Sequence, residues 1–144
     1  MTAPRSALEA ATAALAQRDR SAASLVAYLE RRGAAPEDAS SAVERLAAAG
    51  YVDDARFALR RAEVLAERGQ GDEAIRFALA TDGVGAEEID AALAALAPER
   101  ERALAALRHA KTPLATARRL AAKGFSADAV ESALAALPHE EVIR

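Results

Sequence analysis

The chain has 144 residues, a net charge of −3 and no cysteine, and 52% of its residues are apolar although only 3% are aromatic. The lack of cysteine excludes disulfides, thiolate metal sites and a cysteine nucleophile. No uncharged apolar run approaches the about 18 residues of a membrane span, and Met1–Leu15 does not resemble a signal peptide. We therefore expect a cytoplasmic protein that does not enter a membrane.

Alanine occurs 43 times and β-branched residues are few, which favours helices over strands along the whole chain. The first helix is predicted over residues 4–18, and Ser21 marks the start of the second. Corresponding first helices are predicted over residues 53–68 and 98–110, and Thr112 followed by Pro113 marks another start. The sequence thus predicts an all-α protein of about nine short helices.

A repeated pattern surrounds Gly33, Gly83 and Gly124. A leucine stands four residues before each glycine, and apolar residues at offsets of six, nine, ten and thirteen after it trace one helical stripe. A glycine at this place ends a helix in the left-handed conformation without a Cβ penalty. We therefore expect three tandem three-helix repeats, residues 1–49, 50–97 and 98–144, that form an elongated, curved body.

Charge is unevenly distributed along the chain. Residues 50–97 carry ten acidic and five basic groups, whereas residues 98–144 carry six acidic and eight basic groups. Adjacent basic residues are the best candidates for contacts with an acidic partner or with phosphate, and those of the last third rank highest. The candidates are Arg18, Arg20, Arg31, Arg32, Arg60, Arg61, Arg118, Arg119 and Lys123.

The segment Gly50–Ala58 contains two adjacent carboxylates, Asp53 and Asp54. Asp53 suits the N-cap of the helix that follows, and Asp54 then lies in the first turn, where the helix dipole favours negative charge. The alternative is a metal site or a general acid and base, but no histidine or third carboxylate stands nearby in sequence. His109 and His139 are isolated, and no nucleophile has a base beside it, so we expect no catalytic residues, metal or cofactor.

Five segments together resemble the RecX family, in an order and spacing that extend from about Ala7 to Leu137. They are Gly50-Tyr51-Val52-Asp53-Asp54-Ala55-Arg56-Phe57-Ala58, Leu15 with Arg18-Asp19-Arg20-Ser21 and Leu25, Leu29 with Arg32-Gly33, Ile89 with Ala92-Leu93, and Gly124-Phe125-Ser126 with Val130.

The resemblance implies a regulator that lies in the groove of the RecA filament on single-stranded DNA, and we expect the chain to be a monomer. Such proteins lower the ATP hydrolysis, strand exchange and co-protease activities of RecA. This chain departs from the pattern at Asp72, Glu73 and Asp82, where basic residues are usual. Two alternatives therefore stay open: a module that binds DNA directly, and a helical scaffold for another protein partner.

Overall fold

The computed structural model describes residues 6–138, and this part of the chain contains nine α-helices and no strand. His139 lies outside the described residues. The helices are α1 (Ala7–Gln17), α2 (Ala22–Arg31), α3 (Pro36–Ala48), α4 (Asp54–Glu67), α5 (Asp72–Thr81), α6 (Ala86–Ala95), α7 (Glu99–Arg108), α8 (Pro113–Ala122) and α9 (Ala127–Ala135).

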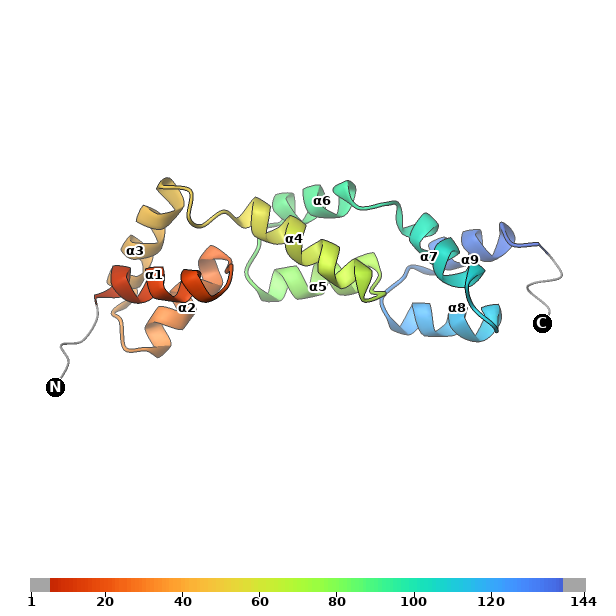
Figure 1. Ribbon diagram of the computed structural model, residues 1–144, viewed down its shortest axis with the longest axis horizontal. Coiled ribbons are helices and arrows are strands. Elements are labelled where there is room, and N and C mark those ends of the chain that lie inside the picture. Colours follow the sequence, from red (N-terminus) through yellow and green to blue (C-terminus); the bar gives the residue numbers. More distant parts are fainter. Residues whose placement is uncertain (1–5, 139–144) are drawn as a thin grey trace.

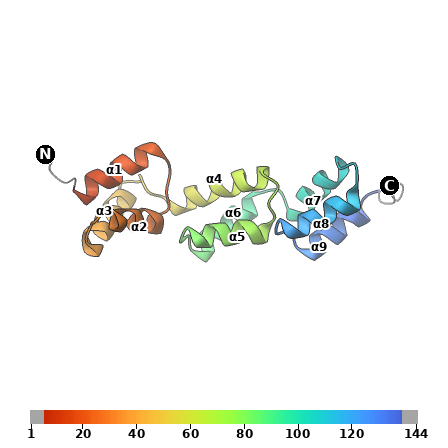
Figure 2. The same cartoon turned by 90° about the horizontal axis from the view of Figure 1, so that it is seen from below.

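The helices form three triplets that follow one another along the long axis of the molecule (Figures 1 and 2). The first triplet is α1–α3, the second α4–α6 and the third α7–α9, and the extensive helix contacts in residues 6–138 lie within triplets. The expected all-α architecture of three three-helix repeats is confirmed. Figure 1 shows the middle helices α2, α5 and α8 along its lower edge.

Each triplet has its own cluster of buried apolar side chains, and alanine is prominent in all three. Ala11 and Ala39 in the first triplet and Ala58 and Ala62 in the second are fully buried. Because alanine is small, the helices pack closely without large core residues. Val52 belongs to the first cluster, although it follows the predicted boundary at residue 49, and the domain boundaries stay a prediction.

The three repeated glycines end α2, α5 and α8 as the sequence predicts. Gly33, Gly83 and Gly124 have φ angles of 97°, 78° and 95°. In each turn, the backbone N–H of the residue after the glycine donates to the carbonyl of the leucine four residues before the glycine, at 3.0 Å. This hydrogen bond closes a Schellman turn and satisfies a carbonyl that the helix end leaves free.

The helix starts predicted at Ser21, Asp53 and Pro113 are confirmed, and Ser126 and Pro36 begin helices in the same ways. The side chains of Ser21, Asp53 and Ser126 accept hydrogen bonds from the backbone N–H three residues later, at 3.1, 3.1 and 3.2 Å. Pro36 and Pro113 occupy the first helical position, where a missing N–H costs nothing. None of the helices in residues 6–138 is long and apolar enough to cross a membrane.

Candidate interaction surface

The first and second triplets meet at a contact that we call the first joint. The hydroxyl of Ser21 donates to the carbonyl of Asp82 at 2.5 Å, so the start of α2 lies against the end of α5. The carboxylate of Asp54 accepts a hydrogen bond of 2.8 Å from the backbone N–H of Ala22. Asp54 therefore connects two triplets, which is more than the first-turn role that the sequence predicts for it.

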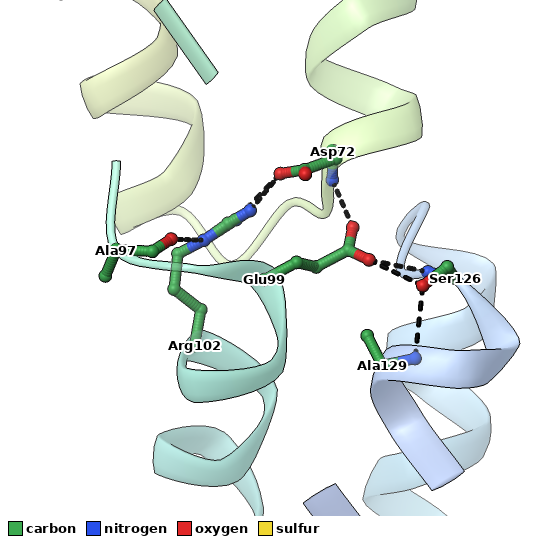
Figure 3. A network of polar contacts seen from close by, with 6 residues as sticks. All are labelled: Asp72, Ala97, Glu99, Arg102, Ser126 and Ala129. Carbon is green, nitrogen blue, oxygen red and sulfur yellow. Dashed lines mark hydrogen bonds and ion pairs between the residues drawn. The ribbon is translucent and has the colours of Figure 1, made fainter. Parts of the chain in front are cut away.

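The second and third triplets meet at a second joint, whose polar network is shown in Figure 3. The carboxylate of Glu99 accepts a hydrogen bond of 2.7 Å from the backbone N–H of Asp72, at the start of α5. It also accepts hydrogen bonds from the backbone N–H and hydroxyl of Ser126, at 3.1 and 2.7 Å. The guanidinium of Arg102 pairs with the side chain of Asp72.

Backbone atoms hold the second joint as well. The N–H of Gly71 donates to the carbonyl of Lys123 at 3.0 Å, and the N–H of Glu73 donates to the carbonyl of Gly124 at 3.1 Å. A Cβ on Gly71 would lie 2.4 Å from the nitrogen of Phe125. Gly71 is therefore buried against the neighbouring turn of the third triplet.

The environment of Glu99 favours its charged form. Burial raises the pKa of this carboxyl, but the hydrogen bonds from Ser126 and Asp72 and the charge of Arg102 outweigh burial and hold the pKa below its usual value. The carboxylate also lies at the positive end of the α5 dipole, which adds to the same preference. Glu99 is therefore ionised, and its carboxylate links α7 to the first residue of α5 and to the N-cap of α9.

The two joints place α8, α5 and α2 end to end. At the second joint the end of α8 meets the start of α5, and at the first joint the end of α5 meets the start of α2. Negative and positive helix ends therefore face each other, which is the favourable arrangement of helix dipoles. Asp54 and Glu99 add a carboxylate to each positive end.

The segment Gly50–Phe57 has mainly structural contacts. Gly50 ends α3 with a φ of 83°, and the guanidinium of Arg56 donates to the carbonyls of Gly50 and Tyr51 at 3.3 and 3.4 Å. Phe57 packs against the second core cluster, whereas the side chain of Tyr51 is exposed. Residues 6–138 contain no group of three histidines or carboxylates with metal-binding geometry.

Four of the nine candidate basic residues come together at the first joint. Arg18, Arg20, Arg60 and Arg61 line one pocket of about 320 Å³, which we call the joint pocket. Asp19 and Asp82 line it too, and the guanidinium of Arg60 lies 3.9 Å from the Asp19 carboxylate. The structure thus joins arginines from the α1–α2 connection with arginines from α4.

Arg20 differs from the other candidates because only 7% of it is exposed. Its guanidinium lies over the ring of Tyr28, at 4.4 Å from the centroid, and its Nε has no hydrogen-bond partner. Burial and the neighbouring charge of Arg18 lower the pKa of Arg20 from its usual value. Arg32 also lies over Tyr28, at 5.0 Å, so a second positive charge stands on the same ring.

The remaining candidates lie at two other places. Arg31 is the last residue of α2 and is exposed, like Arg32 after it. Arg118 and Arg119 are exposed on α8, and Lys123 follows its end at the second joint. The structure therefore does not gather all nine residues on one site.

Sequence reasoning missed Glu99 and Arg102, which complete the second joint. A signal for Glu99 was present, because it begins the first helix of the third triplet as Asp54 begins that of the second. Arg102 had no such signal, since its pairing with Asp72 joins residues that are far apart in sequence. Asp72 and Asp82, which depart from the family pattern, both lie at joints.

Known proteins resemble the chain along most of its length. A sequence model described as "RecX, second three-helix domain" matches residues 53–93. The regulatory protein RecX of Chromohalobacter salexigens is 38% identical over 130 residues, which cover 84% of this chain and 86% of that protein. The regulatory protein RecX of Xanthomonas campestris pv. campestris is 41% identical over 80 residues, or 56% of this chain, and the match spans about half of that relative, 49%.

Solved structures share the fold. The crystal structure of RecX from Lactobacillus salivarius aligns with a TM-score of 0.79 at 15% identity and covers 95% of this chain and 94% of that one. A second crystal structure of a regulatory protein RecX gives a TM-score of 0.74 at 22% identity, with coverage of 87% and 69%.

Proposed function

This chain belongs to the RecX family of regulatory proteins, and on that premise we propose that it is a cytoplasmic negative regulator of the RecA recombinase. It binds the RecA filament on single-stranded DNA as a monomer and lowers ATP hydrolysis, strand exchange and co-protease activity. It acts by binding and has no catalytic reaction of its own. The observation that carries this proposal is the relative that matches over most of both chains.

The physical form of the molecule supports the proposal. Three triplets joined in series make a long row, and such a row contacts successive subunits of a polymer more readily than a sphere of the same mass does. The second joint combines backbone hydrogen bonds, the buried Gly71 and the carboxylate of Glu99, and the side chains of Ser21 and Asp54 hold the first joint. Fixed joints reduce the conformational entropy that is lost when several contacts form together.

The basic residues supply the polar contacts in this proposal. Arginines at the first joint, at the end of α2 and on α8 lie at different points along the row. We assign them to acidic groups of RecA or to phosphates of the DNA inside the filament. The side chain of Asp72 pairs with Arg102 at the second joint, which gives this acidic residue a structural role. Asp82 contributes only its backbone carbonyl to the first joint, so a scaffold for another partner stays the alternative.

The test is the addition of the purified chain to RecA assembled on single-stranded DNA. We expect slower ATP hydrolysis and co-sedimentation of the chain with the filament. The control is a variant in which Leu25 and Leu79 of the core are replaced by aspartate, because two buried, unpaired carboxylates should unfold the chain. Unchanged hydrolysis without co-sedimentation contradicts the proposal.

A further inference from the structure

Two neighbouring pockets meet on the face where α1 approaches α4. The larger one, which we call the outer pocket, has a volume of about 670 Å³ and is lined in part by Leu15, Tyr51 and Arg56. Asp19 and Arg60 line both the outer pocket and the joint pocket. The two pockets therefore adjoin at Asp19 and Arg60, and we call them together the groove, with an apolar wall in one part and a cluster of arginines in the other.

The groove has an excess of positive charge. Five arginines line its two parts, whereas Asp19 and Asp82 are the carboxylates among its lining residues. Arg60 and Asp19 are separated by 3.9 Å, and the Arg60 side chain is 68% exposed, so their ion pair is weak and open to exchange. An incoming carboxylate would find several guanidinium groups that it can pair with.

Arg20 is the second sign that this groove takes a ligand. It is nine-tenths buried, none of the ion pairs in residues 6–138 includes it, and its Nε has no hydrogen-bond partner. Buried polar atoms without a partner are rare in folded proteins, and a buried charge is costly unless an opposite charge compensates it. The Tyr28 ring compensates part of the Arg20 charge, and Asp19 Oδ2 beside it also has no hydrogen-bond partner. An acidic group in the joint pocket would add an opposite charge for Arg20.

We propose that the groove binds an acidic peptide segment of a protein partner. One apolar side chain of the segment enters the outer pocket between Leu15 and Tyr51, and its carboxylates pair with Arg18, Arg20, Arg60 and Arg61. The inference rests on the proposed function only in taking the RecA filament as the source of the segment. It adds that the groove binds a protein segment and not DNA.

The lining of the groove favours a peptide over nucleic acid. The carboxylates of Asp19 and Asp82 repel the phosphates of DNA and the carboxylates of a peptide alike, so the apolar part of the groove makes the distinction. The outer pocket offers an apolar wall and, at about 670 Å³, enough room for an apolar side chain of a peptide. A segment that alternates carboxylates with an apolar residue satisfies both parts of the groove.

The first measurement identifies what lies in the groove. Tyr51 is replaced by the photoreactive residue p-benzoyl-phenylalanine, a substitution that should not disturb the fold because the side chain of Tyr51 is exposed. The full chain is then irradiated while it is bound to RecA filaments. We expect crosslinks to one RecA segment that contains aspartate or glutamate beside an apolar residue. Crosslinks to DNA or to a basic segment overturn the inference while the proposed function stands.

The second measurement compares two variants of equal net charge. The groove variant carries Arg18→Glu and Arg60→Glu, and the control carries Arg45→Glu and Arg100→Glu, all at exposed positions. We expect the groove variant to bind filaments about tenfold or more weakly than the wild type, and the control to differ by less than about threefold. Equal losses in both variants overturn the inference, and a wild type that does not bind filaments overturns the proposed function with it.

Discussion

Asp54 and Glu99 are equivalent residues: each begins the first helix of its triplet, and each accepts a hydrogen bond from the first backbone N–H of the middle helix in the preceding triplet. The donors are Ala22 and Asp72, at 2.8 and 2.7 Å. Two residues 45 positions apart thus make the same contact with different side chains. The joint is a repeated feature of the fold, like the helices themselves.

Removal of either carboxylate destabilises the row. Asp54→Ala leaves the Ala22 N–H without its acceptor, and Glu99→Ala removes three hydrogen bonds. We expect a loss in the free energy of unfolding of about 1 kcal/mol for Asp54→Ala and about 1–3 kcal/mol for Glu99→Ala, measured by urea unfolding. Glu101→Ala, an exposed change in the same first turn of α7, is the control and should stay within about 0.5 kcal/mol of the wild type.

The contribution of Glu99 depends on pH. Its pKa lies below the usual value of 4.5 in the folded chain, so its stabilising effect is complete above that value and is lost as the pH falls through the folded pKa. The difference in unfolding free energy between wild type and Glu99→Ala should therefore be constant from about pH 8 to about pH 6 and shrink below about pH 4.5. Urea titrations along this range measure it, and a difference that persists unchanged at about pH 3 would contradict the assignment.

Gly71 and Gly85 form a matched pair of N-cap glycines with ordinary φ angles of −86° and −71°. A Cβ on Gly71 would meet backbone atoms of Gly124 and Phe125 at 2.5 and 2.4 Å, whereas on Gly85 it would meet only the flexible end of Glu88. We expect Gly71→Ala to cost about 1–3 kcal/mol more than Gly85→Ala in urea unfolding. Small-angle scattering of the two variants tests whether the second joint opens, and equal profiles with equal stability would show that Gly71 is not needed there.

Binding to bare single-stranded DNA separates the proposed regulator from a direct DNA-binding module. The net charge of −3 and the dispersed arginines predict weak binding, with a shallow dependence of log K on log salt concentration. Fluorescence anisotropy with a labelled oligonucleotide at about 50 and about 200 mM salt measures both quantities. Tight binding that falls by a factor of about 1,000 between those concentrations would favour the DNA-binding module instead.

The fold could be predicted from the sequence because the residues that determine it lie close together along the chain. The glycines that end α2, α5 and α8, the serine and aspartate caps, and the apolar stripes all depend on residues within one or two turns of each other. Local chemistry also predicted the N-cap role of Asp53. A pattern of this kind recurs in each repeat, which makes it easier to recognise.

The joints were harder to predict because the residues that contact each other there are distant in sequence. Gly71 looks like a loop residue until the turn at Gly124 is placed against it. The sequence likewise ranked Arg118 and Arg119 above the arginines of the first triplet, because it cannot show that Arg18 and Arg61 line one pocket. Whether any of these basic residues contacts a partner stays a prediction.

The second joint sets the distance between two triplets through main-chain atoms. The N–H groups of Gly71 and Glu73 and the carbonyls of Lys123 and Gly124 define that distance, and none of these groups belongs to a side chain. The spacing between the second and third triplets is therefore held by the backbone, whereas the first joint uses the side chains of Ser21 and Asp54. Substitutions on the exposed faces of these two triplets can change what each triplet binds. The spacing between the triplets is preserved, because exposed side chains do not set it.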